Sequence, residues 1–294
     1  MGLRLNTKID RVAMITTLSK AEFNNNILWL QGLVKTYKGR YRIGKDGWSH
    51  RACIRFDGKK GAVHISVERY FSSRFLKYEF KPQCMSDKAF LELDLATDDF
   101  GKAGYRSCLV HGAISYLEIA ADFVGRNTSE ILIFRPYVNA TVDGSKKVIN
   151  TYYLGSRKSA RTTVAYNRGS HPGATPAEKA WSNLMRVEVR LRRPKIAPVD
   201  LGALKTPFAQ VHVCDFESLK AKAGDDPMAI EVLNACRMAG SPVAFSIHPK
   251  YRKPIMKLAA SNHAPWWQPA NLMNKWQSTV ARQLGMDVLG VGQV

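Results

Sequence analysis

Apolar and polar residues follow a strand-like pattern in the first two thirds of the chain. Eight stretches have the alternation and the flanking turn residues that are typical of strands. They are residues 8–18, 52–58, 62–70, 74–80, 114–123, 147–154, 160–168 and 185–193. Between them, helical spacing predicts a helix over 21–34, one that Ser86 caps, one over 103–112 and one near Ser129. A turn is expected at Asp143-Gly144.

The pattern changes beyond Pro194, where helical stretches are divided by Gly, Pro and Asn. These stretches are 215–224, 227–239, 249–260 and 269–284. Pro198, followed by Asp200, Leu201 and Gly202, is the best linker candidate. We therefore predict an α+β fold. Residues 1–198 would form a largely antiparallel sheet with helices packed on one face, and residues 199–294 a helical C-terminal extension.

The chain is strongly basic, with 44 Lys+Arg against 24 Asp+Glu and a formal net charge of +20. Such an excess costs self-repulsion and is not needed for folding, so an anionic polymer is the expected partner, with nucleic acid first. An acidic membrane surface usually requires a basic amphipathic helix or a lipid signal, and neither is clear here. No run approaches membrane-spanning length. We expect a cytoplasmic protein that does not associate with membranes.

Cysteines and histidines give no sign of a metal site or a disulfide framework. The five cysteines are scattered and form no Cys-x-x-Cys pair. No two histidines lie one, three or four residues apart, which argues against a local two-histidine metal site. A zinc ribbon and a disulfide scaffold are therefore not supported.

The strand at 185–193 holds a carboxylate inside a row of cations. Because strand side chains alternate, Glu188 shares one face with Arg186, Arg190 and Arg192. Glu188 could ligate a divalent metal while the arginines hold phosphates. The alternative is a half-buried strand whose wet face carries balanced ion pairs.

The strand at 114–123 places two acids on one face, Glu118 and Asp122. At about 3.3 Å per residue they lie about 13 Å apart, too far to bind one ion without curvature. Either acid could still meet Glu188 from an adjacent strand. The alternative for each is an ordinary surface acid.

Three ordered motifs resemble the rolling-circle replication initiators of the filamentous-phage gene II and trans-acting plasmid Rep types. They are Tyr-Leu-Gly-Ser-Arg-Lys-Ser at 153–159, Thr-Val-Ala-Tyr at 163–166 with a cation at Arg168, and Arg-Val-Glu-Val-Arg at 186–190. The segment 114–123 is similar to an Arg-x-Asp element of that group, with Glu118 at the acid and Tyr116 replacing the Arg. Asp122 matches a second acid found in part of the group. The resemblance spans residues 8–195, and the histidine pair of many other Rep proteins is absent.

The resemblance implies a phage or plasmid replication initiator that nicks and rejoins DNA at a specific site. Tyr166 would be the nucleophile, forming a 5′-phosphotyrosyl ester and leaving a free 3′-hydroxyl, with Tyr152 and Tyr153 as competitors. Tyrosine has a usual pKa of about 10, so it requires activation by Arg168 and by a metal ion. Glu118, Asp122 and Glu188 would hold that ion, and oxygen ligands indicate Mg²⁺ or Mn²⁺.

Several cations are candidates for DNA phosphate contacts: Arg157, Lys158, Arg161, Arg186, Arg190 and Arg192. The resemblance implies as partners the replication origin, duplex and single-stranded, with a host helicase and polymerase, in a bacterial host cytoplasm and as a homodimer. Trp266, Trp267 and Trp276 either stack bases or pack in the core. The alternative functions are a non-catalytic basic DNA-binding protein, in which the three acids pair with arginines, and a conjugative relaxase of the same chemistry.

Overall fold

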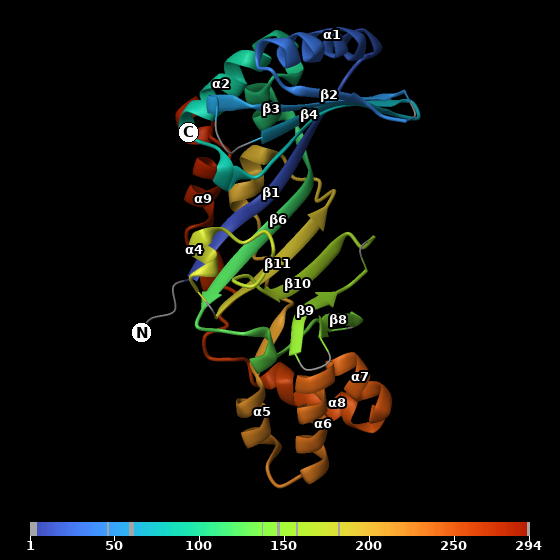
Figure 1. Ribbon diagram of the computed structural model, residues 1–294, viewed down its shortest axis with the longest axis vertical. Helices are drawn as coiled ribbons and strands as arrows, with labels where there is room; N and C mark the ends of the chain where they lie inside the picture. Colours follow the sequence, from blue (N-terminus) through green and yellow to red (C-terminus); the bar gives the residue numbers. More distant parts are fainter. Residues whose placement is uncertain are drawn as a thin grey trace. The chain divides into compact units, whose positions relative to one another are not determined.

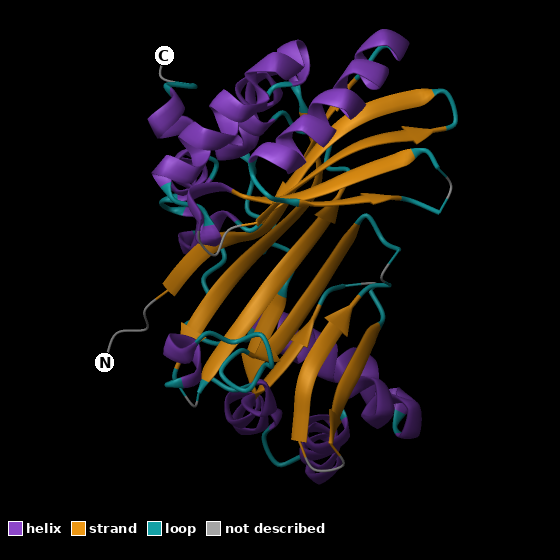
Figure 2. Ribbon diagram, turned by 45° about the horizontal axis from the view of Figure 1, so that its top comes forward, coloured by secondary structure: helices purple, strands orange, loops and turns teal. Residues whose placement is uncertain are grey.

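The computed structural model describes residues 5–45, 47–58, 62–136, 138–145, 148–156, 158–181 and 183–292. Within these ranges the chain has the expected α+β fold, with a ten-stranded sheet in the order β2-β3-β4-β5-β1-β6-β11-β10-β9-β8 and a two-stranded sheet of β12 and β7 (Figures 1 and 2). All the strand pairs with a described register are antiparallel.

The strands are β1 (Leu5–Thr17), β2 (Arg40–Ile43), β3 (Ser49–Arg55), β4 (Ala62–Tyr70), β5 (Ser73–Phe80), β6 (Ala113–Val124), β7 (Ile131–Phe134), β8 (Ala140–Ser145), β9 (Val148–Leu154), β10 (Arg161–Asn167), β11 (Leu184–Arg192) and β12 (His212–Asp215). The α-helices are α1 (Lys20–Thr36), α2 (Asp87–Thr97), α3 (Tyr105–His111), α4 (Pro176–Lys179), α5 (Phe216–Ala223), α6 (Pro227–Ala239), α7 (Ser241–Ile247), α8 (Pro249–Ser261), α9 (Trp276–Gln283) and α10 (Met286–Leu289). Short 3₁₀ turns connect several of them.

The described residues divide into two compact units, each assembled from separate stretches of the chain. Unit 1 comprises the described parts of Met1–Thr7, Ala120–Arg190 and Lys205–Asn274. Unit 2 comprises the described parts of Lys8–Ile119, Leu191–Leu204 and Lys275–Val294. The C-terminal helices are therefore shared between the units, and the predicted boundary at residue 198 stays a prediction.

In unit 2, helix α1 covers one face of strands β2, β3, β4 and β5 (Figure 1). The helix begins with a capping box, in which Ser19 accepts from the backbone of Glu22 and the Glu22 side chain accepts from the backbone of Ser19. Phe23, Asn26 and Leu30 form its buried face. Ser86 caps α2 as expected from the sequence.

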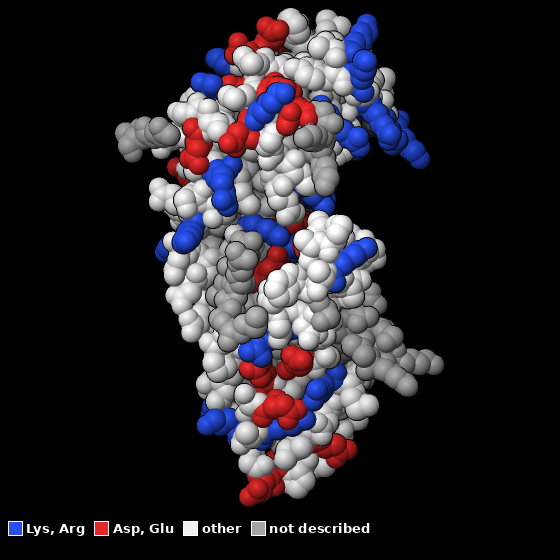
Figure 3. All heavy atoms as spheres, turned by 60° about the vertical axis from the view of Figure 1, so that its left-hand side comes forward, with Lys and Arg blue, Asp and Glu red and all other residues white. Residues whose placement is uncertain are grey.

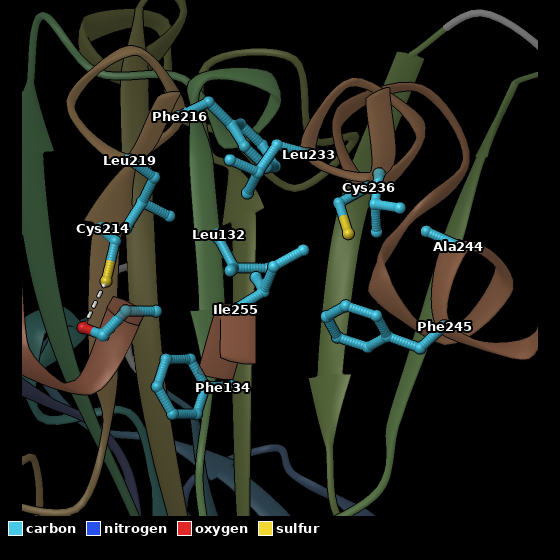
Figure 4. Packing of buried hydrophobic residues seen from close by; sticks show 12 residues of the cluster. Leu132, Phe134, Cys214, Phe216, Leu219, Leu233, Cys236, Ala244, Phe245 and Ile255 are labelled. Carbon is cyan, nitrogen blue, oxygen red and sulfur yellow. Dashed lines mark hydrogen bonds between the residues drawn. The ribbon is translucent and has the colours of Figure 1, made fainter. Parts of the chain in front are cut away.

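In unit 1, helices α5 to α8 pack around the β7–β12 pair and the strands β8 and β9. Their common core includes Leu132 and Phe134 of β7, Cys214 of β12 and Leu233 and Cys236 of α6 (Figure 4). Because β7 and β12 are 78 residues apart at the pair Phe134–His212, this core depends on a contact distant in sequence.

Several local predictions were wrong. Asp143 and Gly144 lie inside β8, where a register shift against β9 replaces the expected turn. The helix expected near Ser129 is one 3₁₀ turn, Thr128–Glu130, before β7. The stretch 269–284 is a 3₁₀ turn at Asn271–Met273 followed by α9.

The tryptophans of the C-terminal region pack in the core, the alternative that the sequence favoured. Trp266, Trp267 and Trp276 are buried, and their indole N–H groups donate to Asp215, to the Val211 carbonyl and to the Leu201 carbonyl. They are therefore not placed to stack on bases. Among the described helices none is both long and apolar enough to cross a membrane.

Candidate active site

Tyr166 and Glu188 meet on the neighbouring strands β10 and β11. The Tyr166 phenol donates a hydrogen bond of 3.0 Å to Oε1 of Glu188. The tyrosine is 8% exposed and the carboxylate residue only 2%. A carboxylate so placed can accept the proton of the phenol, which is the first requirement for a tyrosine nucleophile.

Glu188 has a second partner on its own strand. Arg190, two residues along and on the same face, donates to Oε2 from Nη2 at 2.8 Å and from Nε at 3.3 Å. The guanidinium compensates a buried negative charge that would otherwise be costly. The Arg190 side chain is one third exposed.

His171 lies against the ring of Tyr166, with the ring centres 5.1 Å apart. Its Nδ1 accepts from the Gly173 backbone N–H at 3.1 Å, which requires this nitrogen to be unprotonated. Burial, followed by the positive charge of Arg168, lowers the pKa of His171 below its usual 6.5. The imidazole beside Tyr166 is therefore neutral at pH 7.

Four charged residues of unit 1 form a network next to this tyrosine. Arg186 is fully buried and donates two hydrogen bonds to Asp122, from Nε at 2.5 Å and from Nη2 at 2.8 Å. Its Nη2 also donates to Glu178 at 2.9 Å. Arg168 donates to the other oxygen of Glu178 at 2.9 Å. Burial would raise the pKa of Glu178, but hydrogen bonds from Arg168 and the Thr175 backbone, and the charges of Arg168 and Arg186, lower it to about 2.

We expect Glu178→Gln to destabilise the protein at pH 7 by about 1–3 kcal/mol, because two arginines lose a charged acceptor. The depressed pKa of Glu178 means that its contribution is present above the ordinary carboxyl pKa of 4.5 and is lost as pH falls toward 2. Urea unfolding at several pH values should therefore show that, below pH 4.5, the free energy of unfolding decreases less steeply with falling pH in the variant than in wild type. Glu217→Gln, at an exposed acid, is the control. The same pH dependence of the free energy of unfolding in wild type and Glu178→Gln would contradict this role.

Each of three acids on different strands has its own hydrogen-bond donor. Asp10 of β1 accepts from the Gln83 side chain at 2.9 Å, and Glu118 of β6 accepts from the Tyr116 phenol. Glu188 accepts from Tyr166. Such donors fix the orientation of a carboxylate that is to bind an ion.

Asp10, Glu118 and Glu188 are buried, and each offers a carboxylate oxygen that could serve as a metal ligand, Asp10 and Glu118 in unit 2 and Glu188 in unit 1. They lie on β1, β6 and β11. Three carboxylate oxygens suit a hard cation such as Mg²⁺ or Mn²⁺, so this group could hold the expected metal. The third predicted ligand, Asp122, lies outside the group and pairs with Arg186.

The predicted DNA-contacting cations fall in different environments. Lys158 and Arg192 are exposed, and Arg192 lies 5.5 Å from the centre of the Tyr116 ring. Arg161 donates to Gln210 and to the Pro207 carbonyl, and burial, with the charge of Arg135, lowers its pKa to about 10. Arg186 is committed to two carboxylates, and Arg157 lies outside the described residues.

The register of β9 and β10 separates the two competing tyrosines. Tyr166 is opposite Thr151, and Tyr153 is opposite Val164, so Tyr153 shares the face of Tyr166. Tyr152 points to the other face, is fully buried and donates to the Ile131 carbonyl at 3.3 Å. Burial raises the pKa of Tyr152, which disfavours its phenolate.

Sequence reasoning missed Asp10, His171 and Glu178. Asp10 offered a weak signal, because it is an acid next to Ile9 in the stretch predicted as a strand over residues 8–18. Glu178 offered one as well, since Thr175 and Glu178 have the spacing of a capping box, which the structure contains. His171 had no recognisable pattern around it.

No family model matches the chain, and no curated protein matches it. Among solved structures the chain is similar to a rolling circle replication initiator protein from Geobacillus stearothermophilus, with a TM-score of 0.38 and 13% sequence identity. The similarity covers 67% of this chain and 77% of that one.

Proposed function

We propose that this protein is a rolling-circle replication initiator of a phage or plasmid, a site-specific nickase and religase that acts through Tyr166. The observation that carries the proposal is the hydrogen bond from the Tyr166 phenol to the buried carboxylate of Glu188. A carboxylate is a group that can take the phenol proton as the tyrosine attacks. The partner of Tyr166 is one of three buried acids that could each give a metal ion an oxygen ligand.

In the proposed reaction the Tyr166 oxygen attacks the scissile phosphorus, and the bond from phosphorus to the 3′-oxygen breaks. Glu188 accepts the phenol proton, and the departing 3′-oxygen takes up a proton to become the 3′-hydroxyl. The 5′-phosphotyrosyl ester conserves the energy of the broken bond. Attack by the 3′-hydroxyl on this ester reverses the step and rejoins the strand.

Asp10, Glu118 and Glu188 would hold Mg²⁺ or Mn²⁺, which when bound supplies positive charge to the phosphate. Arg190 is the predicted cation best placed to contact the DNA backbone, because it is partly exposed and adjacent to Glu188. The neutral His171 beside the Tyr166 ring provides an uncharged surface against which a base or sugar can pack.

A non-catalytic DNA-binding protein is the second candidate. It is favoured by the pairing of Asp122 with Arg186 and of Glu188 with Arg190, which is what purely structural acids would do. It gives no role to the hydrogen bond from the Tyr166 phenol to Glu188.

The proposal is tested by incubating the full chain with Mg²⁺ or Mn²⁺ and a library of single-stranded oligonucleotides with a randomised centre. Denaturation in boiling detergent followed by recovery of protein-bound DNA would capture a covalent adduct, and sequencing the DNA would give the nick site. We expect an adduct whose DNA shares one sequence, attached at Tyr166 by mass spectrometry. Tight binding of the library with no adduct in either metal would favour the second candidate.

A further inference from the structure

Two hairpin tips of unit 2 lie side by side and expose aromatic rings. Trp48, at the end of the β2–β3 loop, is 51% exposed, and Tyr70 and Phe71, at the β4–β5 turn, are 66% and 80% exposed. The Arg69 backbone N–H donates to the Trp48 carbonyl at 3.1 Å, and the Arg69 guanidinium lies 4.3 Å from the Trp48 ring centre. The rings of Tyr70 and Phe71 meet edge to face, 4.6 Å apart.

Phe71 occupies a backbone conformation that favours glycine. It is the first residue of a two-residue turn between the paired residues Tyr70 and Ser73, and its φ is +53°. A bulky residue at positive φ is an outlier, and glycine is the usual residue at such a turn position. Packing of the side chain does not offset this strain, because Phe71 is the most exposed large apolar residue in the described part of the chain. Folding alone therefore does not explain Phe71.

Arginines face one another directly across both hairpins. Arg69 is opposite Arg74 in the β4–β5 pair, and Arg42 is opposite Arg51 in the β2–β3 pair. Like charges in directly opposed positions destabilise a sheet. Arg51 forms an ion pair with Glu68 at 3.5 Å and donates to the Ser49 hydroxyl at 2.8 Å. Figure 3 shows Lys and Arg side chains gathered at the upper right, in the part of the molecule that holds α1 and β2 to β4 in Figure 1. A surface that concentrates positive charge in this way is complementary to an anion.

We propose that these residues form a binding surface for single-stranded nucleic acid. The hairpin-tip surface consists of Trp48, Tyr70, Phe71, Arg42, Arg51, Arg69 and Arg74. Exposed rings interleaved with arginines match a strand whose bases are unpaired, since each base offers a face for stacking and each phosphate a charge. A duplex hides its base faces inside the stack, so the rings select single strands. The inference does not depend on nicking, because none of these residues belongs to the candidate active site.

The decisive variant is Phe71→Gly in the full chain, because this change should increase the stability of the protein and decrease its affinity for single-stranded DNA. Relief of the strained backbone should raise the melting temperature, whereas loss of the ring should weaken binding of a 20-nucleotide oligothymidylate. Loss of one stacked base corresponds to a rise in Kd of about 5- to 150-fold. Binding of a 20-base-pair duplex should change by less than about twofold, since its bases are already stacked. Leu95→Ala, at an exposed apolar residue of α2 that is 77% exposed, is the control and should change neither binding constant.

The arginines are tested by the salt dependence of binding. Arg69→Ala and Arg74→Ala should each reduce the slope of log K against log salt for the single strand by about 0.7, the value for one phosphate contact. Phe71→Gly should leave that slope unchanged. The proposal is overturned if Phe71→Gly weakens single strand and duplex equally, or leaves both unchanged. It is also overturned if sedimentation shows that Phe71→Gly converts a dimer to a monomer while DNA binding is unaffected, since the occupant would then be a second copy of the chain.

Discussion

Replacement of Tyr166 by phenylalanine is expected to abolish the covalent protein–DNA adduct and DNA nicking while retaining DNA binding. The change removes the proposed nucleophilic oxygen and the hydrogen bond to Glu188, and it leaves the ring in place against His171. Glu188 keeps both of its bonds from Arg190, so its charge stays compensated. The loss of stability should be about 1 kcal/mol, the usual cost of one hydrogen bond. Adducts would be detected as slow-migrating species after boiling in detergent, and stability by urea unfolding.

Tyr153→Phe is the matched control, because Tyr153 lies on the same face of the neighbouring strand β9. This variant should retain full adduct formation. Tyr152→Phe tests the opposite face and should also retain it, although loss of its bond to Ile131 will lower stability. Persistence of the adduct in Tyr166→Phe, with its loss in Tyr153→Phe, would move the nucleophile to Tyr153. An adduct in all three variants would place it elsewhere in the chain.

The strands that alternation predicts are those with one buried and one wet face or with flanking turn residues. Strand β4 was predicted over its observed range, 62–70, and β6 and β11 to within a residue at each end. Strands β7 and β12 were missed, because each is only four residues long. The four residues of β7 are all buried, so they have no alternation to detect. Their pairing joins positions about 80 residues apart, which no local pattern contains.

For the candidate site, alternation gave the face of each side chain but not its partner. Glu188 and Arg190 were correctly placed on one face of β11, and the structure adds that they bond to each other. Arg186 was predicted as a phosphate contact on the same grounds, yet it is fully buried between Asp122 and Glu178. Alternation along β11 gives no indication of that burial, because Glu178 reaches Arg186 from a separate short helix, α4. Asp10 was missed because no motif or spacing in the sequence connects it with Glu118 and Glu188.

Removal of one carboxylate from the acidic group is expected to abolish both metal binding and nicking. Glu188→Gln should reduce the affinity for Mn²⁺ strongly, because a hard cation requires the charge of its carboxylate ligands. Without a metal the variant should keep its fold, because glutamine has the size of glutamate and can still accept a hydrogen bond from Tyr166 or Arg190. Asp10→Asn and Glu118→Gln should behave in the same way. Asp122→Asn separates the two ligand sets, because Asp122 pairs with Arg186 outside the group, and this variant should lose stability but keep Mn²⁺ binding.

The measurements are calorimetric titration with Mn²⁺ and the shift of the melting temperature on adding it. In wild type, Mn²⁺ at about 100 times its Kd should stabilise the fold by about 2.7 kcal/mol, and in Glu188→Gln this stabilisation should disappear. Glu217→Gln, at an acid that is exposed and paired with Lys220 and Arg237, is the control and should bind Mn²⁺ as wild type does. Undiminished nicking by the wild type in excess chelator would show that no divalent metal takes part. A different result would place the ion at Asp122. In that case Glu188→Gln, Asp10→Asn and Glu118→Gln would all still bind Mn²⁺, and Asp122→Asn would not, because these variants differ only in which carboxylate has lost its charge.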